Sequence, residues 1–238
     1  MEVPNDIFAL FERSKEHLSE MVKEYGICME RGNITPRAKI ITHQALSLCR
    51  NALDHAMRFY WNQKWYSRLS KTQKSSFNLV YFPVARSKKD FRNKLNKNKM
   101  DNLKICDPTV YKFLADCQAF NNDNYQWLHS LNALAGEGKH EHLIEQKRID
   151  HTHYTLEFVP EGKLIWRVST TKVDPNNIAQ KRNEYLGSEE LPENLGLKET
   201  VMQRSSFTIK KIKHEALLFC QEAQQKAIEL VKEFFQLF

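Results

Sequence analysis

Arg50, Asn51 and His55 lie close together in the sequence and combine the side chains needed to act on a phosphodiester. An arginine neutralises a phosphate group, and a histidine transfers protons near neutral pH. These two side chains are the minimum set for cleaving RNA without a metal ion. In such a reaction His55 acts as general base on a ribose 2′-OH or as general acid. Arg50 stabilises the charged transition state, and Asn51 orients His55 or the phosphate.

A long amphipathic helix is predicted to carry these three residues. It starts at Thr35–Pro36, with the threonine as N-cap and the proline at the first helical position, and its pattern runs to about Tyr66. With about 100° of rotation per residue, Arg50 and His55 fall at the two edges of the polar face, roughly 140° apart. Asn51 and His55, at i and i+4, are neighbours on the helix surface.

One copy of this helix therefore does not bring Arg50 and His55 together. Two copies facing each other across a two-fold axis would form one composite cleft, so we expect a homodimer whose interface includes residues 47–58. Asp54, at i+4 from Arg50, is predicted to pair with the arginine when the cleft is empty.

The segment from Arg50 to His55 resembles the Arg-x(4–6)-His signature of the HEPN superfamily. Further blocks resemble those of uncharacterised bacterial HEPN-like proteins and occur in the same order. These blocks are Phe82-Pro83-Val84, Leu131-Asn132-Ala133-Leu134 and Lys139-His140-Glu141-His142-Leu143. The likeness covers about residues 40–145.

The resemblance implies a helical domain, and many such domains are metal-independent endoribonucleases of toxin–antitoxin and phage-defence systems. It also implies that Lys139 and His140 lie near the motif helix and contribute charge there. An antitoxin or another defence protein is a partner that this family would suggest. HEPN toxins paired with nucleotidyltransferase antitoxins carry a tyrosine two residues after the histidine. Met57 occupies that position here, so modification of such a tyrosine is not expected.

Three other interpretations stay open, and one of them is an oligomeric scaffold that binds no nucleic acid. An arginine, an asparagine and a histidine at this spacing also occur on ordinary surface helices that form no site. A HEPN-like domain can also bind RNA or a protein partner without cutting RNA. The basic run at residues 86–104, with Lys88, Lys89 and Arg92, is the candidate RNA contact, although most such runs are simply solvated faces.

The composition of the 238-residue chain limits the functional classes. Its net charge of +7 permits a polyanionic partner such as RNA. The five cysteines are scattered without a CxxC pair, which indicates neither disulfides nor a zinc site and suits a cytoplasmic location. No segment resembles a signal peptide or a membrane span. His140 and His142 lack a completing cluster of ligands, so neither a metal nor a cofactor is expected.

The periodicity predicts a mostly α protein, α+β overall, in a single domain. By resemblance, its helices form a HEPN-like antiparallel bundle with a small antiparallel β insert. We expect a helical core at 1–148, a hairpin and loop insert at 149–210, and a C-terminal helix at 211–238 that docks on the core. Three further helices are expected at about 5–30, 107–120 and 123–134; Asp107–Pro108 starts the second and Asp123 caps the third. The other elements expected are a polar connection at 67–76, an extended segment at 77–84, hairpin strands at 152–159 and 164–168, a third strand at 200–209, and a loop at 174–198.

Overall fold

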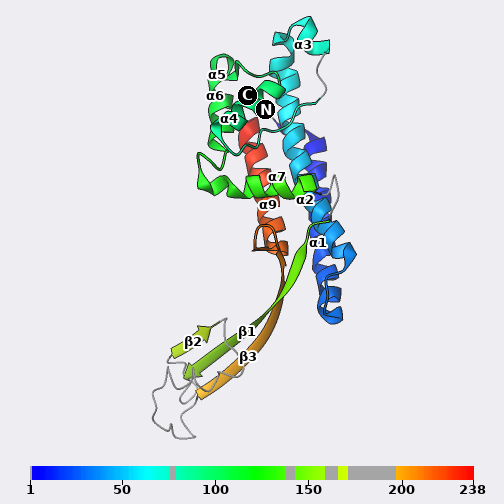
Figure 1. Ribbon diagram of the computed structural model, residues 1–238, viewed down its shortest axis with the longest axis vertical. Coiled ribbons are helices and arrows are strands. Elements are labelled where there is room, and N and C mark those ends of the chain that lie inside the picture. Colours follow the sequence, from blue (N-terminus) through cyan, green and yellow to red (C-terminus); the bar gives the residue numbers. More distant parts are fainter. Residues whose placement is uncertain (1, 76–78, 138–142, 159–165, 171–196) are drawn as a thin grey trace. The chain divides into compact units, whose positions relative to one another are not determined.

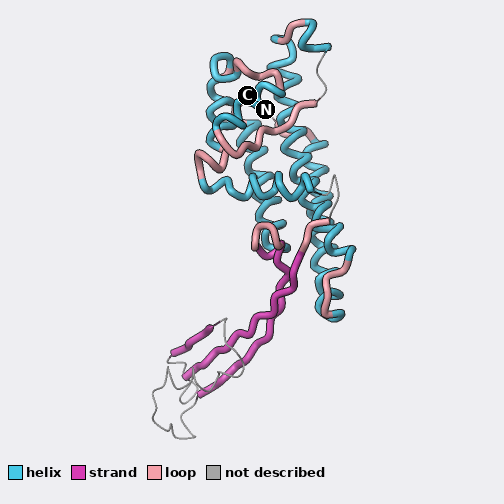
Figure 2. The backbone as a smooth tube through the Cα atoms, viewed as in Figure 1, coloured by secondary structure: helices cyan, strands magenta, loops and turns pink. Residues whose placement is uncertain are grey.

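The computed structural model describes residues 2–75, 79–137, 143–158, 166–170 and 197–238. The chain divides into two compact units, one formed by residues 1–146 with 209–238 and the other by residues 147–208. The first unit is helical, and the second contains most of an antiparallel sheet (Figures 1 and 2). The expectation of a mostly helical protein with a small antiparallel sheet is confirmed. Within the described residues, no helix combines the length and apolar character needed to cross a membrane.

Two long helices, α1 (Asn5–Arg31) and α2 (Pro36–Tyr60), pack against each other. The turn between them begins at Gly32, whose φ of 70° is a left-handed conformation that glycine adopts without a Cβ clash. Thr35 then caps α2, because its side chain accepts a hydrogen bond from the Ala38 N–H at 3.1 Å. The predicted start of the motif helix is confirmed.

The chain stays helical to the predicted end at about Tyr66, but it leaves the α-helical hydrogen-bond pattern after Tyr60. The α-helix ends at Tyr60 and is followed by a π turn, η1 (Trp61–Trp65), and a 3-10 turn, η2 (Tyr66–Arg68). Trp61 and Trp65 explain the change. Their indole N–H groups donate to the carbonyls of two consecutive residues, Asn98 at 2.9 Å and Lys99 at 2.7 Å. A wider turn lets both indoles satisfy these carbonyls at once.

The C-terminal helix α9 (Ala216–Phe235) packs against α1, α2 and α7 (Gln126–Glu137). Figure 1 shows that α7 runs across α2 and α9 rather than along them. The end of α9 joins an aromatic cluster in which Phe234 lies 5.7 Å from Tyr60 and 6.3 Å from Phe82, measured between ring centroids. Each such buried ring contributes roughly 1.5–3 kcal/mol to folding. This cluster fixes residue 82 beside α2.

Short helices connect α2 to α7: α3 (Lys71–Ser75), α4 (Lys88–Lys97), α5 (Leu103–Cys106), α6 (Pro108–Asp116) and the 3-10 turn η3 (Asp123–Tyr125). Three local predictions are corrected. The connection expected at 67–76 contains α3, α6 stops before residue 120, and the residue that caps η3 with its side chain is Asn122 rather than Asp123. Helix α6 stops early because the Gln118 side chain turns back and donates to the Leu114 carbonyl at 2.7 Å.

Four strands form one sheet in the order β2-β1-β3-β4: β1 (Gln146–Phe158), β2 (Trp166–Thr170), β3 (Leu197–Ile209) and β4 (His214–Glu215). β1 pairs antiparallel with β2, with Tyr154 opposite Thr170 and Phe158 opposite Trp166, which confirms the predicted hairpin. The last helix begins at Ala216 rather than residue 211, because the turn after β3 and the short β4 precede it. Most of the loop expected at 174–198 lies outside the described residues.

Candidate functional site

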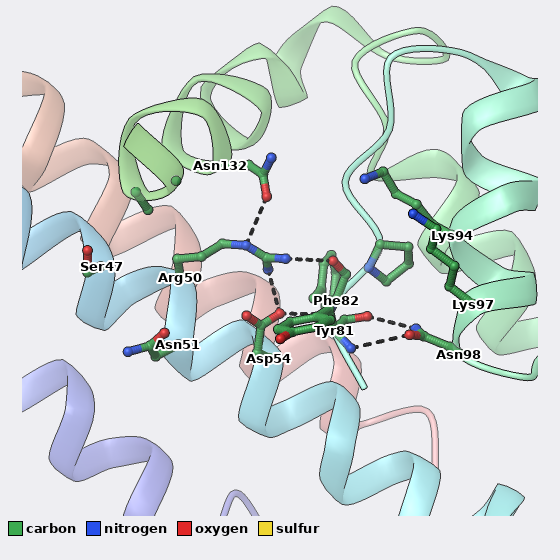
Figure 3. A pocket seen from close by; sticks show the side chains of 13 residues that line it. Ser47, Arg50, Asn51, Asp54, Tyr81, Phe82, Lys94, Lys97, Asn98 and Asn132 are labelled. Atoms are coloured by element: carbon green, nitrogen blue, oxygen red, sulfur yellow. Dashed lines mark hydrogen bonds and ion pairs between the residues drawn. The ribbon is translucent and has the colours of Figure 1, made fainter. Parts of the chain in front are cut away.

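A cavity of about 380 Å³ opens beside the middle of α2 (Figure 3). Its walls come from α2, the extended segment after α3, helix α4 and helix α7. The polar and charged residues that line it are Ser47, Arg50, Asn51, Asp54, Tyr81, Lys94, Lys97, Asn98 and Asn132. Four elements distant in sequence therefore build one site around the predicted motif. We call it the α2 cavity.

Arg50 is the most deeply placed cation of the α2 cavity, with a side chain only 12% exposed. Its Nε donates to Asn132 Oδ1 at 3.0 Å, and its Nη2 donates to the Phe82 carbonyl at 2.8 Å. Its Nη1 lies 2.9 Å from Asp54 Oδ1 in an ion pair without the alignment of a hydrogen bond. Burial lowers the pKa of Arg50 from its ordinary value, and the Asp54 carboxylate opposes that shift. The guanidinium is therefore held in one position by three partners.

The backbone of Phe82 completes this arrangement. Its N–H donates to Asp54 Oδ1 at 2.7 Å while its carbonyl accepts from Arg50 (Figure 3). The predicted pairing of Arg50 with Asp54 is confirmed. The pair also has a structural role that the sequence did not indicate. Asp54 binds the backbone N–H of Phe82, and Arg50 binds the backbone carbonyl of the same residue.

Side chains also bind the backbone at other positions of residues 79–85, a segment that we call the strap. The strap forms no strand, so its buried backbone groups need side-chain partners. Asn98 donates to the Tyr81 carbonyl at 2.8 Å and accepts from the Tyr81 N–H at 3.3 Å. Gln118 donates to the Pro83 carbonyl at 2.9 Å and accepts from the Ala85 N–H at 2.8 Å. The strap is thus a fixed wall of the α2 cavity, and Tyr81 stays 47% exposed on it.

Lys94 and Lys97 enter the α2 cavity from α4, on the side opposite Arg50 (Figure 3). Lys94 is half-buried, Lys97 is exposed, and neither forms an ion pair with a carboxylate that the structure describes. Among the lining residues that the structure describes, Asp54 is the only carboxylate, and it already contacts Arg50 and Phe82. The cavity therefore carries an excess of positive charge beside neutral amide and hydroxyl groups, which suits a phosphate.

The predicted site residues are separated by the structure. Arg50 and Asn51 line the α2 cavity, whereas His55 is exposed and is not among the lining residues. Lys88 and Arg92 line a second cavity, and Lys89 is exposed on α4. The two remaining residues, Lys139 and His140, lie outside the described part of the chain.

Several lining residues were not predicted. Lys94 and Lys97 belong to the basic run, but nothing distinguished them from its other lysines. Asn132 was marked only by the resemblance of Leu131-Asn132 to a HEPN-like block. Tyr81 and Asn98 gave no signal, because contacts across such separations leave no local pattern. Among the described residues, no group of three or more potential metal ligands occurs.

Comparison with protein-family models, with curated proteins and with solved structures gives no significant match for this chain. The chemistry of the α2 cavity is therefore the basis on which a function is proposed.

Proposed function

We propose that this protein is a HEPN-like RNA-binding protein in which the α2 cavity holds a phosphate group of the RNA. The observation that carries the proposal is the set of three cations, Arg50, Lys94 and Lys97, around the α2 cavity. Among its described lining residues the one carboxylate, Asp54, is already paired with Arg50. Lysines without carboxylate partners gain most from a phosphate, because no internal ion pair has to be broken first.

The meeting of the resemblance blocks supports the HEPN-like assignment. Arg50 of the motif contacts Phe82 of the second block and Asn132 of the third, which lie 32 and 82 residues further along the chain. Blocks that share only an order in sequence would have no reason to converge. Their convergence on one guanidinium is expected if the blocks define a common site.

RNA binding to a Lys94→Ala/Lys97→Ala variant tests the proposal. Fluorescence anisotropy with a labelled oligoribonucleotide should show binding that weakens steeply with salt. The variant should bind at least about tenfold more weakly, and its salt slope should fall by about 0.7 for each lost phosphate contact. The matched control is Lys15→Ala/Lys23→Ala, which removes the same charge from exposed positions on α1. Equal affinities of both variants, or binding insensitive to salt, would reject the proposal.

Metal-independent RNA cleavage is the second candidate function, and one observation favours it. Asn51 lines the α2 cavity, and His55 is its exposed i+4 neighbour on α2. A phosphodiester held at Asn51 would thus lie within reach of an imidazole that can act as general base or general acid. A homodimer through residues 47–58 would add a second copy of both groups. A ribonuclease of this type would suit a toxin or phage-defence system with its partner protein.

The test of cleavage compares wild type with His55→Ala on RNA in the presence of a chelator. Loss of a general acid or base should slow cleavage about 10²–10⁴-fold. RNA affinity should stay near that of wild type, since His55 does not line the α2 cavity. Equal cleavage by both proteins, or no cleavage of any RNA, would reject the cleavage function, and RNA binding would be the one proposed function that stands.

A further inference from the structure

A second cavity, of about 500 Å³, lies between α4 and α6. Three aromatic side chains, Phe91, Tyr111 and Phe120, belong to its described lining and lie close to one another. Phe91 lies 5.8 Å from Tyr111 and 6.4 Å from Phe120 between ring centroids. Phe91 is buried, whereas Tyr111 and Phe120 are only half-buried, so those two rings keep surface that a planar ligand could cover. We call this site the α4–α6 cavity.

Cations surround these rings. Lys88, Arg92, Lys104 and Lys112 line the α4–α6 cavity, and within the described part of the chain Asp116 is the one carboxylate beside them. Among the described residues none of the four cations forms an ion pair, and the Lys104 ammonium lies 6.0 Å from the centre of the Tyr111 ring. Like charges gathered without partners repel one another, and a bound anion removes that repulsion.

Aromatic rings interleaved with cations are a combination that selects an unpaired nucleotide. Each base can stack on an aromatic face, and the neighbouring phosphates are neutralised by lysine and arginine. A duplex keeps its bases stacked on one another, so it presents phosphates alone and cannot use the rings. The chemistry of this cavity therefore matches a single strand better than a double helix.

Helix α4 connects the two cavities. At about 100° per residue, Lys88 and Arg92 lie on one side of the helix, roughly 40° apart. Lys94 and Lys97 lie roughly 120–180° away from them around the helix axis. The exposed Lys89 lies on the arc between the two pairs. A helix is about 10–12 Å across, a width that a few nucleotides of a single strand can span.

We propose that the α4–α6 cavity is a base-stacking subsite for single-stranded RNA, and that one strand crosses α4 from there to the α2 cavity. This inference rests on the proposed RNA-binding function and names its substrate class. Tyr111 supplies the stacking surface, Lys88 and Arg92 bind the flanking phosphates, and Lys89 contacts the strand between the cavities.

The test uses RNA length to separate the two cavities. A single-stranded trinucleotide is long enough to fill the α2 cavity alone, whereas a single-stranded dodecamer reaches both cavities. Lys88→Ala/Arg92→Ala and Tyr111→Ala should each weaken binding of the dodecamer about tenfold, and Tyr111→Phe, which keeps the ring, should bind as wild type does. The Lys94→Ala/Lys97→Ala variant should weaken binding of both RNAs. A duplex of the same length should bind wild type more weakly and should not respond to Tyr111→Ala.

The outcomes distinguish this inference from the proposed function. If Lys94→Ala/Lys97→Ala weakens dodecamer binding but the α4–α6 variants do not, the subsite is wrong and RNA binding at the α2 cavity stands. Duplex binding as strong as that of the single strand, with the same loss in Tyr111→Ala, would also overturn the subsite. If wild type binds none of the RNAs, the proposed function fails and the inference falls with it. Because Lys88 and Arg92 are exposed, their variant keeps the test valid even if Tyr111→Ala does not fold.

Discussion

The two sides of α2 that carry Arg50 and His55 differ in almost every physical respect. The strap and α7 contact Arg50, which is buried and held by Asn132, Phe82 and Asp54. His55 is exposed and does not line the α2 cavity. The spacing of a motif thus defines where two side chains leave a helix, but the elements packed over the helix decide what each one does. Arg50 therefore has a structural role in addition to any chemistry, whereas His55 takes no part in building the α2 cavity.

Replacing Arg50 should give the largest effect. Arg50→Ala leaves Asp54 and the Phe82 carbonyl buried without their cation, and breaking a buried pair from one side costs about 3–5 kcal/mol. Urea denaturation measures this loss directly. Arg58→Ala, which removes an exposed arginine from the same helix, is the control and should change the free energy of unfolding by less than about 0.5 kcal/mol. An Arg50→Ala protein as stable as the control would contradict the structural role of Arg50.

Asn98 tests whether the strap that covers Arg50 depends on its side-chain partners. Asn98→Ala leaves both backbone groups of Tyr81 without a partner and should cost about 1–3 kcal/mol of unfolding free energy. The exposed Asn96, in the last turn of α4, provides a matched control, since Asn96→Ala removes no such contact. Equal stability of the two variants would mean that the strap is held by packing alone.

His55→Ala should give the smallest effect on stability. An exposed histidine contributes little to folding, so the free energy of unfolding should change by less than about 0.5 kcal/mol. Thermal unfolding at several protein concentrations sharpens the comparison. A concentration-dependent melting temperature that His55→Ala removes would show that this side of α2 is covered by a second copy. A larger loss without that dependence would mean that His55 has a structural role in the monomer.

Local signals in the sequence were sufficient for much of the helical fold. The Thr35–Pro36 and Asp107–Pro108 starts depend on neighbouring residues, and both are present, with Asp107 accepting from the Val110 N–H at 3.1 Å. The Arg50–Asp54 pair follows from helical spacing and was likewise predictable. The strap's partners were not, since the contacts of Asn98 and Gln118 link residues 17 to 35 positions apart.

The α2 cavity was even less predictable from the sequence, because it also depends on contacts between distant residues. Helical geometry placed Arg50 and His55 at opposite edges of a polar face, yet it could not indicate that one edge would be covered. That outcome depends on the aromatic cluster of α9, which fixes Phe82 beside α2 from the far end of the chain. Lys94 and Lys97 became site residues only because α4 packs across from Arg50. Tertiary packing, rather than residue type, selected them from the basic run.

The side-chain anchoring of the strap also has a consequence for how this chain can change over evolution. Irregular connections normally accept inserted or deleted residues, since their ends can adjust. Here Asn98 binds Tyr81, Asp54 binds Phe82, and Gln118 binds both Pro83 and Ala85. These three anchors come from parts of the chain that are far apart in sequence. A strand in a sheet can shift by two residues and form equivalent backbone hydrogen bonds. The strap cannot, because its partners are individual side chains at fixed positions. One residue gained or lost there would misalign the anchors together, so its length should be as constrained as that of a core helix.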